Sequence, residues 1–112
     1  MKGLSIMDKY EKLTEDLKKA AFVAKEFAYE IDDGGTCNFD SLMLVLFKYD
    51  KEKTLEAIRK AGLRAFKDSF WKAYIISPPV PAQGDMRTIQ AEKMADCMKK
   101  FGYDATVYYQ MD

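Results

Sequence analysis

The stretch DDGGTCNFDS at residues 32–41 gathers residue types that carry out chemistry in proteins. Its aspartates could supply oxygen ligands to calcium, and Cys37 could serve as a nucleophile. An EF-hand loop needs an oxygen ligand at its third position, but a loop that starts at Asp32 or Asp33 has glycine there. The spacing therefore predicts no metal site, and we interpret the two glycines as the end of a helix and the turn that follows it.

The chain contains no histidine. This absence excludes Ser-His and Cys-His dyads, histidine general bases and zinc sites that use histidine. Cys37 and Cys97 are too few for a zinc site made of thiolates alone, and we expect both to be free thiols. Catalysis by Asp32, Asp33 and Asp40 alone is disfavoured, because a helix end and a strand entry suit capping and solvation. We predict a protein that is not an enzyme, with no catalytic residue, no metal and no cofactor.

The 112 residues carry 18 basic and 18 acidic side chains, but these charges are distributed unevenly. The net charge is −3 over residues 1–47, +4 over 48–72 and −1 over 73–112. A basic middle segment suits an anionic partner surface, whereas the neutral total argues against a general polyanion binder. No apolar run is long enough to span a bilayer and the first residues do not form a signal peptide, so we expect a cytoplasmic protein without membrane contact.

Apolar residues recur every three or four positions over residues 6–31, which predicts one long amphipathic helix. Ser5 with Asp8 resembles a capping box, and Gly34 should end the helix. The seam consists of Ile6, Tyr10, Leu13, Leu17, Ala20, Ala24, Phe27 and Ile31. Its small residues favour packing within the chain over a coiled-coil homodimer, which remains the alternative.

Shorter elements follow this helix. Residues 39–47 favour a strand over a helix, since the run is short and apolar on both faces. Asp50 should cap a helix over 51–61, and Asp68-Ser69 should form the turn between strands at 63–67 and 70–77. Asp85 should cap a third helix that Gly102 ends, and the alternation over 103–109 predicts the last strand.

The resulting order is a long helix over 1–33 followed by β-α-β-β-α-β over 36–112. We predict one α+β domain spanning 1–112 with a ferredoxin-like antiparallel sheet that carries helices on one face. The long helix is expected to cover the other face of the sheet, and a second copy of the chain is the alternative cover.

The basic and aromatic segment from Lys60 to Tyr74 is the predicted contact surface, because aromatic and arginine side chains dominate interface energetics. In the predicted strand, Phe70, Lys72 and Tyr74 share one face, which would also suit the stacking of nucleic-acid bases. The alternative is that these rings belong to the core. The predicted partner-binding residues are Lys60, Arg64, Lys67, Phe70, Trp71, Lys72 and Tyr74.

Two strings, DGGTCNFDS at 33–41 and GYDATVYYQMD at 102–112, together with the RT...AEKM pattern that begins at Arg87, resemble uncharacterised small proteins of bacterial phages and prophages. In that pattern a proline follows FDS, whereas this chain has Leu42, which leaves strand and helix both open for 42–47. The resemblance implies a cytoplasmic accessory protein of a mobile element that acts on a host protein, for example by inhibiting a defence nuclease such as a CRISPR nuclease. A single-stranded nucleic-acid binder and a structural homodimer are the alternatives.

Overall fold

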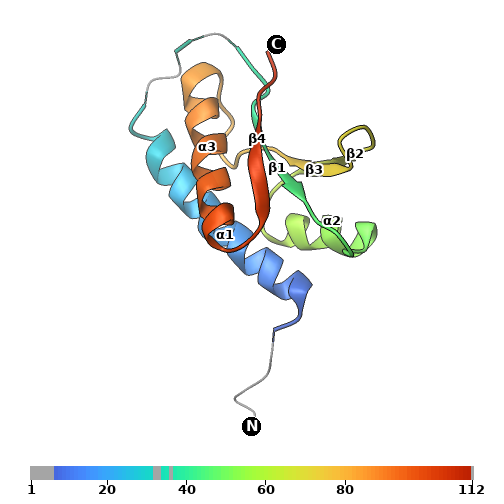
Figure 1. Ribbon diagram of the computed structural model, residues 1–112. Helices are drawn as coiled ribbons and strands as arrows, with labels where there is room; N and C mark the ends of the chain where they lie inside the picture. Colours follow the sequence, from blue (N-terminus) through green and yellow to red (C-terminus); the bar gives the residue numbers. More distant parts are fainter. Residues whose placement is uncertain (1–6, 32–33, 36, 112) are drawn as a thin grey trace.

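The computed structural model describes residues 7–31, 34–35 and 37–111, and it has an α+β architecture of three helices and one four-stranded antiparallel sheet. The strands lie in the order β2-β3-β1-β4 (Figure 1). The elements are α1 (Lys9–Ala28), β1 (Ser41–Val45), α2 (Lys51–Lys60), β2 (Ala65–Asp68), β3 (Ala73–Ile76), α3 (Gly84–Lys100) and β4 (Asp104–Tyr108).

Helix α1 confirms the long N-terminal helix, but both of its ends differ from the prediction. Asp8 is the N-cap, and its side chain and that of Glu11 form a reciprocal capping box. The predicted Ser5 cap lies outside the described residues. The helix ends at Ala28 rather than at Gly34, because the N–H groups of Glu30 and Ile31 bond three residues back and tighten the last turn.

Small side chains bring α1 and α3 together, and this is the most extensive contact between any two described elements (Figure 1). An alanine surface lets two helix backbones approach closely. The alanines that are buried on these two helices are Ala20, Ala21, Ala24, Ala28, Ala91 and Ala95. The amphipathic seam therefore packs within its own chain, as its small residues predicted.

The helices share one core with one face of the sheet, which we call the inner face. Leu42, Leu44, Tyr74 and Ile76 point inward and are buried in the same cluster as residues of all three helices. The expectation that the long helix covers the opposite face is therefore wrong: α1 packs on α3 and α2, in the helical layer. The strand prediction for 39–47 is confirmed, although β1 is shorter and only one of its faces is covered by helices.

Asp50 caps α2 as predicted, but Asp85 does not cap α3. Asp85 instead lies in the first turn, where its N–H donates to the carbonyl oxygen of Gly34 at 2.7 Å. Gly84 has a φ of +55°, and a Cβ on it would stand 1.8 Å from the same carbonyl oxygen. The segment before β1 thus crosses α3 so closely that a glycine is required there.

Replacing Ala24 with leucine tests the close approach of α1 and α3. Ala24 is fully buried, so extra methylene groups must displace neighbouring side chains or backbone. We expect Ala24→Leu to lower the free energy of unfolding in urea by about 1–3 kcal/mol. The matched control Lys25→Leu, at an exposed position one residue on, should leave stability nearly unchanged. Equal stability of the two variants would contradict the close packing.

Candidate functional site

The face of the sheet that points away from the helices, which we call the outer face, carries an apolar row across β2, β3 and β1 that ends at Thr106 on β4. Cross-strand pairing sets Phe66 beside Ile75, Ile75 beside Met43, and Met43 beside Thr106. Side chains alternate along strands, so these residues lie opposite the core residues of the same strands. At the two ends of the row Phe66 is 57% exposed and Thr106 is exposed, whereas Ile75 is buried and Met43 is half-buried between them.

The described helices all contribute to the inner core, and none of them packs on the outer face. The two central strands present aliphatic side chains there: Met43 and Val45 from β1, and Ala73 and Ile75 from β3. Aromatic side chains on this face come only from the edge strands, as Phe66 and Tyr108. The outer face is therefore apolar over most of its two central strands, and its edge strands add Phe66 and Tyr108 together with the polar Asp68, Asp104 and Thr106.

The loop between β2 and β3 presents an aromatic pair beside this face. Phe70 is 82% exposed and Trp71 is 52% exposed, and their rings meet edge to face at 5.1 Å between centroids. The Asp68 carboxylate holds the loop by accepting hydrogen bonds from the N–H groups of Phe70 at 2.8 Å and Trp71 at 3.1 Å. Lys72 closes the loop in the left-handed region with a φ of 54°. The pair is thus presented on a loop that its own hydrogen bonds already order.

This hairpin differs from the prediction of strands at 63–67 and 70–77. Two-residue hairpin turns favour residues that adopt positive φ at both positions, such as Asn-Gly, and Asp68-Ser69 does not meet that need. The Asp68 side chain instead caps the next N–H groups, which lengthens the loop to residues 69–72. Phe70, Trp71 and Lys72 consequently lie in the loop and not on a strand.

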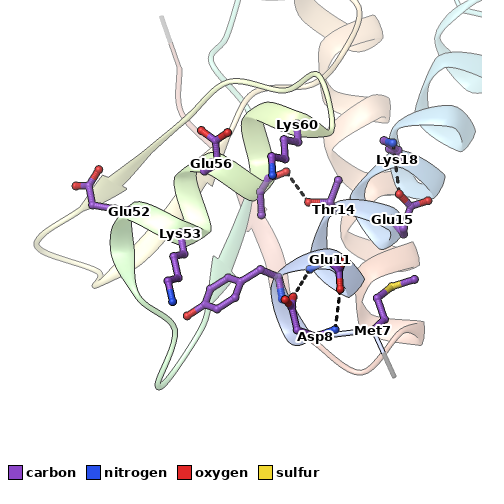
Figure 2. Close-up of a pocket in the computed structure, with 12 residues that line it drawn as sticks. Met7, Asp8, Glu11, Thr14, Glu15, Lys18, Glu52, Lys53, Glu56 and Lys60 are labelled. Carbon is purple, nitrogen blue, oxygen red and sulfur yellow. Dashed lines mark hydrogen bonds and ion pairs between the residues drawn. The ribbon is translucent and has the colours of Figure 1, made fainter. Parts of the chain in front are cut away.

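The structure brings together only part of the predicted contact set. Arg64 and Lys67 are exposed on or just before β2, next to the loop that carries Phe70, Trp71 and Lys72. Lys60 lies at the end of α2, where it lines a groove against α1 (Figure 2).

Tyr74 is the clearest error in the predicted set. It lies on the inner face with 1% exposure, so it cannot contact a partner, and the core alternative holds for this ring. The Lys67 ammonium lies 5.6 Å from the centroid of the Tyr74 ring. The Tyr74 hydroxyl is the one buried side-chain oxygen or nitrogen atom among the described residues that lacks a hydrogen-bond partner.

Sequence reasoning missed the exposed Phe66 and the half-buried Met43 as residues of the outer face. A turn at Asp68-Ser69 would pair Lys67 with Phe70, whereas the structure pairs Lys67 with Tyr74, and both registers leave the same residues on each face. The sequence pattern therefore did not reveal which of the two faces the helices cover. The aspartate at 68, followed by a polar serine and two aromatic residues, carried the signal for a side-chain-capped loop.

A groove of about 960 Å³ runs between α1 and α2 (Figure 2). Five carboxylates and three lysines line it, and Thr14 at its floor donates to the carbonyl oxygen of Ala57 at 2.9 Å. Asp8 and Glu11 form the helix cap, Glu15 lies 3.4 Å from Lys18, and Glu56 pairs with Arg59. Most of the groove's charges therefore already serve the fold.

Two polar residues of the sequence DDGGTCNFDS, Asn38 and Asp40, belong to a buried hydrogen-bonded cluster. The Asp40 carboxylate is 5% exposed and accepts hydrogen bonds from the Thr88 hydroxyl at 2.7 Å and from the N–H of Gln110 at 2.8 Å. Arg87 donates from Nε to the carbonyl oxygen of Asp40 at 2.8 Å, and burial lowers the pKa of its guanidinium while the Asp40 charge opposes that shift. Asn38 donates to the carbonyl oxygen of Gly84. The cluster joins three distant segments, and its role is structural.

A second buried carboxylate fixes α1 to the strand side of the molecule. Asp16 accepts hydrogen bonds from the Lys12 ammonium at 2.7 Å and from the Tyr103 hydroxyl at 2.8 Å. Burial, followed by the hydrogen bond to Asp16, raises the pKa of Tyr103, so the phenol stays protonated as a donor. Burial also raises the pKa of the Cys97 thiol, which disfavours the reactive thiolate.

Within residues 7–31, 34–35 and 37–111, no three acidic or cysteine side chains come close enough to hold a metal ion. Asp32 and Asp33 lie outside these ranges. None of the described helices combines the length and apolar character that crossing a bilayer requires. Comparison with protein-family models, curated proteins and solved structures found no match.

Removing the Tyr74 hydroxyl tests its assignment to the core. Because this buried oxygen has no partner, we expect Tyr74→Phe to leave the free energy of unfolding unchanged or to raise it by up to about 1 kcal/mol. The control Tyr10→Phe deletes a hydroxyl that accepts a hydrogen bond from the N–H of Asp50 at 2.8 Å, and it should lower stability by about 1 kcal/mol. A larger loss for Tyr74→Phe than for Tyr10→Phe would contradict the assignment.

The Asp40 cluster predicts a structural phenotype. Asp40→Ala leaves the N–H of Gln110 without its acceptor and leaves the Thr88 hydroxyl only its longer bond to the carbonyl oxygen of Gly84, so we expect the free energy of unfolding to fall by about 1–3 kcal/mol. Asp96→Ala, an exposed position on α3, is the matched control and should change stability little. Chemical denaturation followed by circular dichroism measures both variants. Indistinguishable midpoints would contradict a structural role for the cluster.

Proposed function

We propose that this chain is a non-enzymatic binding module that contacts another protein through the outer face of its sheet and the Phe70-Trp71 loop. The observation that carries the proposal is the continuity of two apolar features. One is the β2 margin of the outer face, where Phe66 is 57% exposed and no described helix packs, and the other is the ordered, exposed aromatic pair beside it. Contiguous exposed apolar surface on a folded domain marks interaction sites.

The composition of this surface supports a protein partner. Tryptophan, phenylalanine, methionine and arginine are enriched in protein interfaces, and Trp71, Phe66, Met43 and Arg64 are all available here. The hydrogen bonds from Phe70 and Trp71 to Asp68 order the loop before binding, which lowers the entropy cost of association.

We further infer that residues 36–112 form a ferredoxin-like β-α-β-β-α-β unit to which α1 is added. The antiparallel pairing and the position of β1 and β3 at the centre of the sheet support this assignment. RNA-binding domains of this topology stack bases on strand aromatics. In this chain the central strands offer Met43, Val45 and Ile75 instead, which favours a protein partner over single-stranded nucleic acid.

The biological setting of the proposal comes from the resemblance to small phage and prophage proteins. On that basis the partner is a host protein in the bacterial cytoplasm, with a defence nuclease such as a CRISPR nuclease as the working candidate. Nucleic acid remains the second candidate, because exposed Arg64 and Lys72 accompany the exposed rings.

Capture from a bacterial lysate by the immobilised full chain tests the surface. We expect the double variant Phe70→Ser/Trp71→Ser to retain roughly tenfold less of the captured protein than the unmodified chain, because aromatic residues at an interface centre carry most of the binding energy. The matched control is Phe22→Ser/Tyr29→Ser, which removes two rings on or beside α1 that are 65% and 73% exposed and should not alter capture.

Equal loss in both double variants, or no capture by the unmodified chain, would count against the proposed surface. Trp71 is the single tryptophan of the sequence, so its fluorescence reports directly on the loop when a purified partner or an oligonucleotide is added. Oligonucleotide binding at low salt that weakens steeply at moderate salt would favour the nucleic-acid alternative.

A further inference from the structure

Strand β2 lies at one edge of the sheet, and part of its main chain has no partner there. The N–H of Ser77 donates to the carbonyl oxygen of Arg64 at 2.9 Å, which marks Arg64 and Ser77 as a hydrogen-bonded pair. Such pairs alternate along an antiparallel ladder, so Phe66 and Asp68 also bond to β3. Ala65 and Lys67 therefore direct their N–H and C=O groups toward the open edge, where no described residue bonds to them.

The side chains along this edge leave it accessible. Arg64 and Lys67 are exposed, Phe66 is 57% exposed and Ala65 is half-buried, so α2 beneath the strand does not cover it. Arg64, Phe66 and Asp68 share the outer face, and Ala65 and Lys67 share the inner face.

We propose that β2 pairs with β2 of a second copy of this chain, antiparallel about a two-fold axis through Phe66, so that the two four-stranded sheets join into one. In this register Ala65 faces Lys67 of the second copy, and Lys67 faces its Ala65. Each of these two pairs exchanges two main-chain hydrogen bonds, and all four use the groups that β3 leaves free.

The side chains complement one another in this register. On the outer face Arg64 stands opposite Asp68 of the second copy, twice by symmetry, and the two Phe66 rings meet at the axis in a non-hydrogen-bonded pair, where side chains are closest. On the inner face the long Lys67 side chain lies beside a small alanine and not beside another lysine. When a second β2 runs antiparallel to the first, its acidic residue meets the basic residue, and its aromatic residue meets the aromatic residue. This complementarity favours a second copy of the chain over a strand from another protein.

A lysine on a short edge strand ordinarily blocks pairing between sheets. Here it faces Ala65, so the two-fold register contains no like-charge pair. The proposed register pairs residues 64–68 and uses neither Phe70 nor Trp71, so the dimer adds to the proposed binding function without replacing it.

Sedimentation equilibrium of the full chain tests the dimer directly. We expect a concentration-dependent dimer, and we expect Arg64→Glu to weaken it by roughly tenfold, because two opposite-charge pairs become like-charge pairs. Asp68→Lys should weaken its own homodimer in the same way. An equimolar mixture of Arg64→Glu and Asp68→Lys chains should dimerise again, since both pairs then carry opposite charges. A chain that stays monomeric at about 1 mM, or folded variants whose mixture fails to associate, overturns the proposal.

Asp68 also caps the loop, so a second experiment avoids changing it. In a Cys37→Ser background, Phe66→Cys places two thiols on the axis, within reach of a disulfide under mild oxidation. Phe70→Cys, at an even more exposed position in the loop, is the matched control. Rapid covalent dimerisation of the Phe66→Cys chain alone supports the register, and equal or faster crosslinking of the Phe70→Cys chain overturns it.

Discussion

The close packing of alanines between α1 and α3 is the constraint on which the rest of the architecture depends. It places the longest described helix in the same layer as α3 and α2, where it joins their core. A helix with larger side chains on this face would stand further from α3 and compete for other surfaces. Because α1 is used in this way, no described helix lies against the far face of the sheet, and Phe66 and Met43 keep part of their apolar surface accessible there.

Buried polar groups fix the relative positions of the helices and their neighbouring segments, which the alanine contacts alone do not determine. Contacts between alanines do not specify one relative position of two helices. Asp16 does, because its carboxylate accepts directional hydrogen bonds from the Lys12 ammonium and the Tyr103 hydroxyl. Asp40 does the same for Thr88 and the main chain at Gln110. Both carboxylates are nearly buried and hydrogen-bonded, so a shift of either helix would leave a charge without partners.

Periodicity was sufficient to predict much of the fold. It identified the three helices, the strand at 41–45 and the use of the N-terminal seam within the chain. It did not anticipate two side chains that bond to the backbone: Asp8 forms the capping box of α1 together with Glu11, and Asp68 lengthens the hairpin loop. It also could not assign faces. The burial of Tyr74 and the exposure of Phe66 depend on which face of the sheet the helices cover, and the apolar residues on both faces of β3 do not indicate that face.

The hairpin loop is held mainly by its own hydrogen bonds and not by packing in the core. Its ring pair is held by hydrogen bonds to the neighbouring Asp68, while the large buried side chains lie on other segments. Substitutions at Phe70 and Trp71 therefore cost little stability. Under selection by a changing partner, these two positions are free to diversify quickly while the scaffold beneath them stays constant.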